Sequence, residues 1–327
     1  MRILLTRRLI VLIDIMLPVL DSNNAVDQQY LDYLDALTQA GFAGDIETQY
    51  ASRVAMATDN SIYQKLPQAI VYPKHIDDLT LIGQVVSGFA SVAFSARGGG
   101  TGTNGQSLTD GIVVDVSRHM NQILEINAAE QWVKVQAGVV KDALNDALRP
   151  FGYFFAPDLS TSNRATIGGM ISTDASGQGS LVYGKTSDHI LGLISVMANG
   201  DVLTTQPTAI SDCLEHVQSS YQAIAQQIQA SCVEHRDAIL AKFPRLNRFL
   251  TGYDLEHAYL PETQLFDISR LIAGSEGSLV FIAEATLNIT PIAKQKTLIN
   301  IKYNSFEAAL RHAPKMVAAN ATSVETV

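Results

Sequence analysis

Apolar residues recur at helical spacing in the first clearly patterned stretch of the chain. The residues that share one helical face are Val26, Tyr30, Tyr33, Leu34 and Leu37. This spacing predicts an amphipathic helix, and Gly41 supplies a stop signal at its C-terminal end.

The next stretch alternates between strand and helix patterns. A strand bounded by prolines is predicted over 67–75, a helix over Asp77–Phe89, and a strand over Val92–Ala96 that runs directly into a glycine-rich turn. This order is the beginning of a βαβ unit, in which short strands pair in parallel.

After the turn the pattern changes to short strands with tight connections, which favours antiparallel pairing. These predicted strands are 111–116, 123–127, 132–137, 191–197 and 202–205. Asn199-Gly200 marks a hairpin between the last two. Residues 208–242 are expected to be helical and 278–289 to form another strand. The predicted fold class is therefore α+β, with a small, partly parallel lobe followed by a larger antiparallel lobe.

The C-terminal pattern predicts a βαβ unit that is started and then cut off. Thr297–Tyr303 has a strand pattern, Phe306–Val317 that of an amphipathic helix, and Thr322–Val327 that of the start of another strand. A lone unit of this kind would leave apolar faces and strand edges uncovered. We therefore expect the chain to be the N-terminal part of a longer protein.

The first twenty residues fit no targeting segment well. Three arginines precede an apolar run that Asp14 interrupts, no small-residue cleavage site follows, and the run is too short for a transmembrane helix. We prefer translation from Met16 and leave Met1 open as the alternative.

Composition narrows the function classes. The formal net charge is −9 and no Lys/Arg run occurs, which argues against a nucleic-acid partner. The two cysteines, Cys213 and Cys232, cannot hold an iron–sulfur cluster through four thiolates. They also give no reason to expect a disulfide framework, which fits a reducing, cytoplasmic compartment. We expect no metal site in this chain.

The strongest chemical signal is Arg97–Gln106, with five glycines in ten residues directly after a strand. Glycines permit turns that aim successive backbone N–H groups into one concavity, which suits a phosphate or pyrophosphate. Thr101, Thr103 and Asn104 can add side-chain hydrogen bonds, and Arg97 is placed to face an anion or to form a salt bridge. The loop has neither the P-loop ending nor the Rossmann glycine spacing. A flexible surface turn is the alternative.

Two further clusters accompany this loop. Residues 157–177 are rich in hydroxyls and glycines yet contain Ile167, Met170 and Ile171, as expected of backbone around a large, partly apolar ligand. A Ser/Thr-rich linker is the alternative. Gly274–Leu279 is a third glycine-containing turn, which leads into a strand.

Together, in this order and spacing, the three clusters resemble the FAD-binding domain of the vanillyl-alcohol oxidase and p-cresol methylhydroxylase superfamily, over about residues 45–290. The middle block continues as Tyr183–Gly192, as in that family. Two departures stand out: Asp174–Gly177 where Asn-Ala-Gly-Gly is usual, and Val280 in place of a glycine. Within the superfamily, Thr58–Tyr63 and Phe151–Pro157 are most similar to large bacterial dehydrogenases of D-2-hydroxyglutarate or D-lactate.

The resemblance implies a two-lobed FAD-binding domain of the p-cresol methylhydroxylase type, followed by the start of a truncated ferredoxin-like cap. The expected parts are an N-terminal extension and helix at 1–44, the FAD-binding domain at 45–292 with lobes at about 45–118 and 119–292, and the start of the substrate cap at 293–327.

The resemblance also implies the cofactor contacts. The residues expected to bind FAD are Arg97, Gly98, Gly99, Gly100, Thr101, Gly102, Thr103, Asn104, Pro157, Ser162, Thr166, Gly168, Gly169, Thr173, Asp174, Ser176, Gly177, Gly184, Glu276 and Ile282. Covalent members attach FAD through a histidine in or beside the first loop. Because Arg97–Gln106 contains neither His nor Cys, non-covalent FAD is predicted.

By the same resemblance, a small 2-hydroxy acid is oxidised by hydride transfer to flavin N5. The catalytic residues are expected mostly in the cap and beyond, so the catalytic base stays unknown, and His119, His189 and His257 are most simply structural. An iron–sulfur cluster is expected only in a full-length protein, and the electron acceptor is unknown. Peripheral attachment to the inner membrane face stays open. The alternatives are a non-catalytic flavin-binding fragment, a UDP-N-acetylmuramate reductase-like enzyme, and a sugar or alcohol oxidase.

Overall fold

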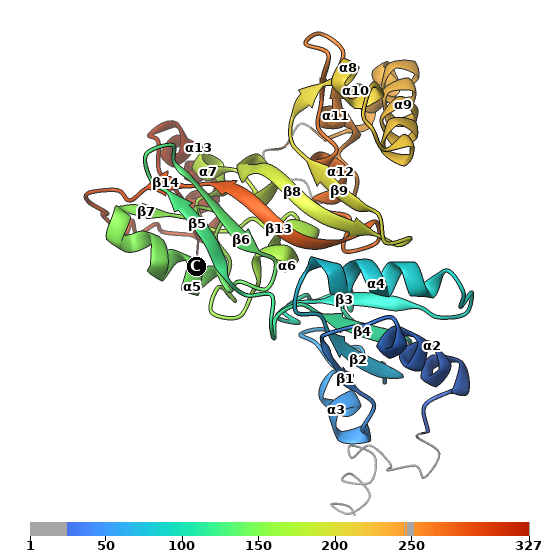
Figure 1. Cartoon of the computed structure of the whole chain (residues 1–327). Coiled ribbons are helices and arrows are strands. Elements are labelled where there is room, and N and C mark those ends of the chain that lie inside the picture. Colours follow the sequence, from blue (N-terminus) through green and yellow to red (C-terminus); the bar gives the residue numbers. More distant parts are fainter. Residues whose placement is uncertain (1–24, 245, 247–251, 327) are drawn as a thin grey trace, which may run out of the picture.

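The structure, a computed structural model, describes residues 25–244, 246 and 252–326 (Figure 1). The expectations for the first twenty residues, including the choice between Met1 and Met16, lie outside the described residues. The described chain forms two lobes, each built on its own sheet, and a group of short helices that projects from the second lobe (Figure 1).

The first lobe contains a four-stranded sheet in the order β1-β2-β4-β3. Its strands are β1 (Asp45–Glu47), β2 (Ala69–Tyr72), β3 (Phe94–Arg97) and β4 (Ile112–Asp115). β2 and β3 both pair in parallel with β4, whereas β1 is antiparallel to β2. Every residue of β2 and β4 is buried, as expected of central strands covered on both faces.

Helices α2 (Gln28–Gln39) and α4 (Ile76–Val86) pack against each other, and the short α3 (Tyr50–Ala55) contacts β2. Both predicted helices, and the parallel βαβ beginning, are confirmed. The buried face of α2 consists of four of the residues that the periodicity selected, and its Tyr33 hydroxyl donates to the carbonyl of Ile82 at 3.1 Å. Gly41, with φ of 95°, follows the helix as expected.

The predicted antiparallel pairing of 111–116 is wrong, because this segment becomes β4, the parallel strand between β2 and β3. A parallel pair needs a long crossover, and the glycine-rich segment 98–111 provides it. The glycine loop therefore connects two strands of one sheet.

The second lobe contains an antiparallel sheet in the order β5-β6-β13-β8-β9. Its strands are β5 (Ile123–Asn127), β6 (Trp132–Gln136), β8 (Ile190–Met197), β9 (Val202–Thr205) and β13 (Val280–Asn288). The predicted hairpin is present between β8 and β9, with Gly200 at φ of 86°.

Shorter elements complete this lobe. They are α5 (Lys141–Leu148), η1 (Arg149–Phe151), β7 (Tyr153–Phe154), α6 (Ile167–Ser172), α7 (Ser180–Tyr183), η2 (Thr186–His189) and β14 (Thr290–Pro291). The small lobe and the larger antiparallel lobe share one continuous hydrophobic core. Phe94 of β3 meets Phe281 of β13 edge to face, with ring centroids 6.4 Å apart. The two lobes are therefore packed together rather than linked loosely.

Residues 208–242 do not form a continuous helix, which corrects the prediction. They divide into β10 (Thr208–Ala209), α8 (Ile210–Leu214), α9 (Ser219–Glu234) and α10 (Arg236–Lys242). The buried side chains of Cys213 and Tyr221 contact each other at 3.7 Å, and this contact requires the chain to fold back between α8 and α9.

The projecting group of helices also includes α11 (Leu255–Ala258), β11 (Tyr259–Leu260), β12 (Leu265–Phe266) and α12 (Ser269–Ile272) (Figure 1). None of the helices within the described ranges combines the length and the apolar composition that crossing a membrane requires.

At the C-terminus, α13 (Phe306–Ala318) forms as predicted, but the strands predicted over 297–303 and from 322 do not. A strand needs a neighbour to pair its backbone groups, and none of the described strands pairs with these segments. Leu298 and Ile299 are consequently 85% and 75% exposed, and no residue of α13 is buried.

The packing of α2 predicts that it contributes strongly to the stability of the first lobe. Leu37 is fully buried, whereas Gln39 is exposed. Leu37→Ala should lower the free energy of unfolding by about 2–5 kcal/mol in urea titrations. Gln39→Ala, the matched control, should change it by less than about 0.5 kcal/mol. If Leu37→Ala and Gln39→Ala lowered the free energy of unfolding by the same small amount, α2 would not be part of the core.

Candidate functional site

All three glycine-containing clusters meet in one cleft between the lobes. Its wall is formed by the loop after β3, by α6 with the residues around it, and by the segment from Glu276 into β13. About 1030 Å³ of empty space, part of it open to solvent, lies between them.

Glycines let two of the clusters approach closely. A Cβ on Gly98 would lie 2.1 Å from Thr166 Oγ1, and a Cβ on Gly99 would lie 2.1 Å from the carbonyl oxygen of Arg164. Gly168 allows a similar approach to Ala137. The glycine loop of the first lobe is thus seated directly on the start of α6, where Thr166 Oγ1 accepts a hydrogen bond from the Gly169 amide at 3.3 Å.

Arg97 lines the cleft, but its guanidinium is engaged elsewhere. It donates to the carbonyls of Thr58 at 2.8 Å and Met56 at 3.3 Å. Burial lowers the pKa of the guanidinium, against the raising effect of Asp115 and Asp59. Arg97 therefore attaches the segment before β2 to the glycine loop, a structural role that the sequence did not suggest. Any contact with the cofactor stays a prediction.

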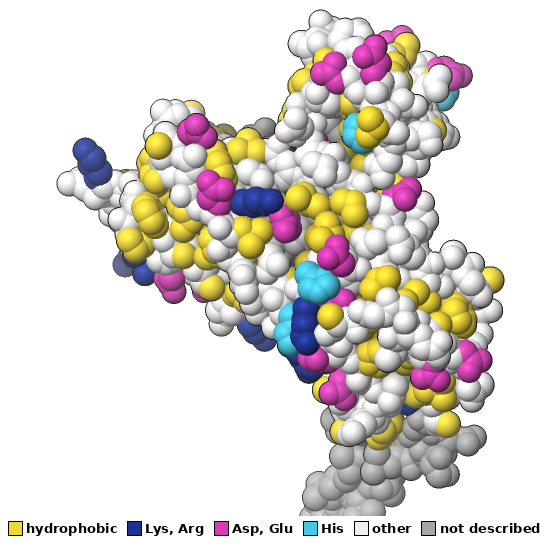
Figure 2. All heavy atoms as spheres, in the orientation of Figure 1, with side chains coloured by type: hydrophobic (Ala, Val, Ile, Leu, Met, Phe, Trp, Pro, Cys, Tyr) yellow, Lys and Arg dark blue, Asp and Glu magenta, His cyan; other side chains and the backbone are white. Residues whose placement is uncertain are grey.

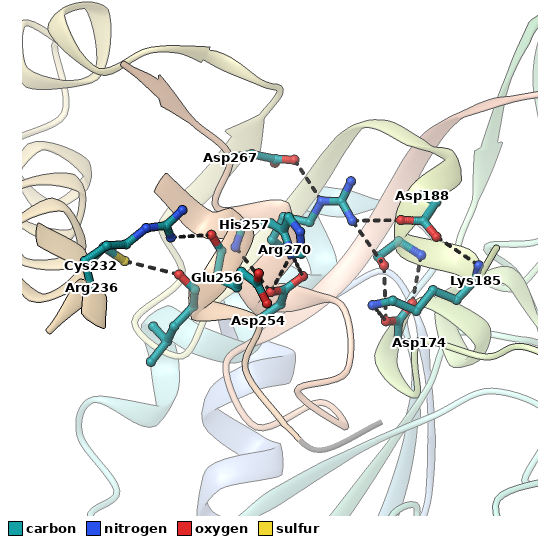
Figure 3. Close-up of polar contacts among 12 residues, drawn as sticks. Asp174, Lys185, Asp188, Cys232, Arg236, Asp254, Glu256, His257, Asp267 and Arg270 are labelled. Atoms are coloured by element: carbon teal, nitrogen blue, oxygen red, sulfur yellow. Dashed lines mark hydrogen bonds and ion pairs between the residues drawn. The ribbon is translucent and has the colours of Figure 1, made fainter. Parts of the chain in front are cut away.

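Asp174 and Lys185 form a buried ion pair beside the cleft (Figure 3). Asp174 adopts φ of 45°, a left-handed conformation that a short Asx side chain tolerates. Its carboxylate also accepts from the Ser187 amide at 2.8 Å and the Ser187 hydroxyl at 3.1 Å. These donors account for a carboxylate at a position where the family pattern has an amide.

The ion pair belongs to a longer polar network (Figure 3). Arg270 donates to Asp188 at 3.0 Å, and Asp188 accepts from the Lys185 amide at 3.0 Å. Burial raises the pKa of Asp188, but this amide and Arg270 outweigh it, so the pKa lies below its usual value. Burial likewise raises the pKa of Asp254, but the hydrogen bond with His257 and the charges of His257, Lys185 and Arg270 together lower it below its usual value.

Gln106 lines the cleft but was not among the residues predicted to bind FAD. Its side-chain carbonyl accepts from the Asn104 amide at 3.1 Å, and its amide donates to Glu276 at 3.4 Å. It thus joins the first cluster to the third. Its place at the end of the glycine loop was the available signal, but its partner 170 residues away could not be read from the sequence.

The cleft and a polar chamber that continues from it contain most of the predicted site residues. Those on the walls are Arg97, Gly98, Gly99, Gly100, Thr101, Gly102, Thr103, Asn104, Thr166, Gly168, Gly169, Thr173, Asp174, Ser176, Glu276 and Ile282. Those outside them are Pro157, Ser162, Gly177 and Gly184. Gly177 allows close approach to the Asp158 carbonyl, and Gly184 adopts φ of 72° after α7. Their contacts with a cofactor remain predictions.

The three histidines near the family blocks pair with protein groups. His119 contacts Asp45 at 2.7 Å, His189 contacts the Tyr183 carbonyl at 2.7 Å, and His257 contacts Asp254 at 2.9 Å. Within the described residues, no group of three or more His, Cys, Asp or Glu side chains is arranged to hold a metal ion. On the face shown in Figure 2, Lys and Arg side chains are few and do not form a continuous basic surface.

A comparison with protein families indicates which kind of domain contains the cleft. Residues 67–206, which contain the first two clusters, match the model of an FAD-binding domain. The chain thus contains a stretch that matches an FAD-binding domain. The resemblance predicted from the three clusters is thereby confirmed.

Several curated relatives are D-2-hydroxyglutarate dehydrogenases, and others are glycolate oxidase subunits. The chain is 56% identical to that of Pantoea ananatis and 54% identical to that of Escherichia coli, in each case over 95% of the chain. It spans only about a third, 31%, of the length of either relative.

A solved structure of alkyldihydroxyacetonephosphate synthase has a similar fold, with a TM-score of 0.58 and 19% sequence identity. The match covers 85% of this chain and 44% of that one. At this identity the likeness concerns the fold alone.

The contact between the loop and the start of α6 predicts that Gly99→Ala will weaken FAD binding at least about tenfold. The added Cβ would collide with the Arg164 backbone, which cannot rotate away. Gly88→Ala is the matched control, because its Cβ would meet its nearest atom at an ordinary 3.7 Å. Titration of the apoprotein by quenching of FAD fluorescence measures both. Unchanged affinity in folded Gly99→Ala would contradict this geometry.

The lowered pKa of Asp188 predicts a pH dependence of stability. Because the folded-state pKa lies below the unfolded value of about 3.9, the charged carboxylate stabilises the fold above that pH. This contribution is lost as the pH falls through the folded-state pKa. Urea unfolding should therefore show Asp188→Asn less stable than the parent at pH 6, with a difference that shrinks as the pH falls below about 3.9.

Asp146→Asn is the control for this pH series, since the pair between Asp146 and Arg149 is about two-thirds exposed on both sides. It should match the parent throughout. A destabilisation by Asp188→Asn that is the same at every pH would show that the charge of Asp188 is not involved.

Proposed function

We propose that the cleft holds FAD without a covalent bond, and that the protein containing this chain oxidises a D-2-hydroxy acid, with D-2-hydroxyglutarate as the first candidate. The observation that carries the proposal is the high identity to D-2-hydroxyglutarate dehydrogenases over nearly the whole chain. The cleft and its wall residues support it independently.

The walls suit the two chemical halves of FAD. The backbone of Gly98–Gly102 lines the cleft, and residues without a Cβ leave the main-chain amides accessible to a phosphate. Apolar side chains such as Met170, Val280 and Ile282 line the same cleft and suit an aromatic ring system. The described residues that line the cleft and chamber include neither His nor Cys, which supports non-covalent binding.

Bound FAD would supply the acceptor for the hydride that leaves the α-carbon of the hydroxy acid, while the hydroxyl proton passes to a base. This chain's residues would bind and orient the cofactor and exclude water from one side of it. None of the described residues has the placement that would assign it as the base. We propose that the base and the substrate-binding cations lie in the part of the longer protein that corresponds to the rest of the relatives' length.

We further propose that 45–292 form the FAD-binding unit, with α2 packed on its first lobe, and that 293–327 begin a ferredoxin-like substrate cap. Exposed apolar residues in the C-terminal segment support this division, because they would be covered once the rest of a cap is present. An iron–sulfur cluster would then lie in the longer protein. We propose a cytoplasmic location, with peripheral attachment to the membrane as an option if a quinone accepts the electrons.

The test is anaerobic reduction of bound flavin by D-2-hydroxyglutarate, monitored as the loss of the visible absorbance of oxidised flavin. The full-length protein should be reduced by the D-enantiomer and much more slowly by the L-enantiomer. This chain alone should bind FAD but react slowly, because it lacks the proposed base.

D-lactate and other 2-hydroxy acids serve as comparison substrates. A full-length protein that binds FAD but is reduced by none of these acids would refute the dehydrogenase assignment. The proposal that the cleft binds flavin would not be affected by that result.

A further inference from the structure

The turn Thr58–Tyr63 lies outside the cleft but contacts the glycine loop. It follows α3 and precedes β2 in the first lobe, and Thr58 and Gln64 at its two ends form an isolated antiparallel bridge. No residue of this turn is among the described residues that line the cleft or the polar chamber. Any effect of the turn on the site therefore passes through its contacts with the loop.

The turn holds the glycine loop at its beginning and in its middle. Arg97, the first residue of the loop, donates to the Thr58 carbonyl at 2.8 Å. The Asn60 amide donates to the Gly100 carbonyl at 3.1 Å. Gly100 has a φ of 60°, and a Cβ at this position would lie 2.5 Å from the Arg97 guanidinium. The loop and the turn are therefore in close contact at both points.

The bond to the Gly100 carbonyl also orients an amide of the loop. In a trans peptide the C=O and the N–H point in opposite directions, and none of the described peptide bonds is cis. Because the Gly100 carbonyl faces the turn, the Thr101 amide of the same peptide unit points away from the turn. Thr101 lines both the cleft and the chamber. The turn thus fixes the direction of one amide in the stretch proposed to receive a phosphate.

Asp59 connects the turn with the residue just after the loop. One of its carboxylate oxygens accepts from the Ser61 amide at 2.8 Å, a local bond that shapes the turn itself. The other accepts from the Ser107 hydroxyl at 3.2 Å. The same hydroxyl accepts from the Arg97 guanidinium at 3.5 Å. The half-buried side chains of Arg97, Ser107 and Asp59 therefore form one chain of hydrogen bonds that links both ends of the loop to the turn.

We propose that Asp59 is a positioning residue for FAD, which holds the glycine loop, before the cofactor binds, in the shape that presents its amides to the cleft. The inference rests on the proposed flavin binding. Asp59 lies outside the cleft, so it acts through the turn and through Ser107. A loop with five glycines in ten residues has much conformational freedom to lose on binding. A loop that is already held in place loses less, which strengthens binding.

The experiment measures FAD affinity and the stability of the apoprotein in two variants of Asp59. Asp59→Ala removes both side-chain bonds. Asp59→Asn keeps an oxygen for the Ser61 amide and has an NH2 group that can donate to the Ser107 hydroxyl.

Two controls separate positioning from stability. Asp32→Ala is the matched control, because the exposed Asp32 also accepts a side-chain hydrogen bond, from Gln28 at 2.8 Å in α2. Leu37→Ala removes core packing of the first lobe and shows what a loss of stability alone does to FAD affinity.

Quenching of FAD fluorescence should show that Asp59→Ala binds about fivefold more weakly or worse, while Asp59→Asn stays within about twofold of the parent. In stopped-flow measurements the loss should appear mainly as slower association, because only protein with the loop already in shape binds. Asp32→Ala should match the parent. Leu37→Ala, where folded, should be less stable but keep the affinity and association rate of the parent.

A double-mutant cycle tests the link through Ser107. Because Asp59→Ala and Ser107→Ala remove the same hydrogen bond, the double variant should weaken FAD binding by less than the two single effects combined. Fully additive losses would show that Asp59 does not act through Ser107 and would contradict the proposed path.

The outcomes separate this inference from flavin binding itself. Folded Asp59→Ala with the affinity of the parent would overturn the inference. An equal loss of affinity in Leu37→Ala, or an Asp59→Ala apoprotein that no longer folds, would also overturn it, because Asp59 would then serve only the stability of the lobe. A parent that binds no FAD would instead refute the proposed function.

Discussion

The site depends on one close contact, in which the backbone at Gly98 and Gly99 lies directly against Arg164 and Thr166. No side chain larger than hydrogen fits at either glycine without displacing the second lobe. This contact joins the end of β3 in the first sheet to the start of α6 on the second. Because the glycine loop is also the crossover between β3 and β4, the architecture of the first lobe and the wall of the cleft come from the same ten or so residues.

Other contacts maintain this arrangement of the lobes. A Cβ on Gly83 of α4 would lie 2.4 Å from the Gly200 amide in the β8–β9 hairpin, so helix and hairpin touch through their backbones. Phe94 and Phe281 add an apolar contact near the cleft. The cleft is therefore a surface between two packed bodies, as is common for cofactor sites. Its shape depends on small residues far apart in the sequence.

Much of this could be predicted from the sequence because the signals are local. The spacing of Tyr33 and Leu37 predicts α2, the hairpin at Gly200 is marked by its dipeptide, and the glycine loop identifies one wall of the cleft. What could not be predicted depends on partners distant in the chain. The parallel pairing of β4, the bonds of Arg97 to the carbonyls of Met56 and Thr58, and the bond between Gln106 and Glu276 are all of this kind. The prediction of strands in the C-terminal segment was wrong for a related reason, because a segment with an extended pattern forms a strand only where it pairs with a neighbouring strand.

The central claim is that the cleft binds FAD without a covalent bond, and release of the cofactor tests it most directly. The purified protein, saturated with FAD and freed of excess by gel filtration, is denatured in acid, and the supernatant and the precipitate are analysed for flavin by chromatography. If the cofactor is bound without a covalent bond, about one FAD per chain is expected in the supernatant and none in the precipitate. Flavin that stays with the precipitated protein, or a protein that retains no flavin after gel filtration, would contradict it.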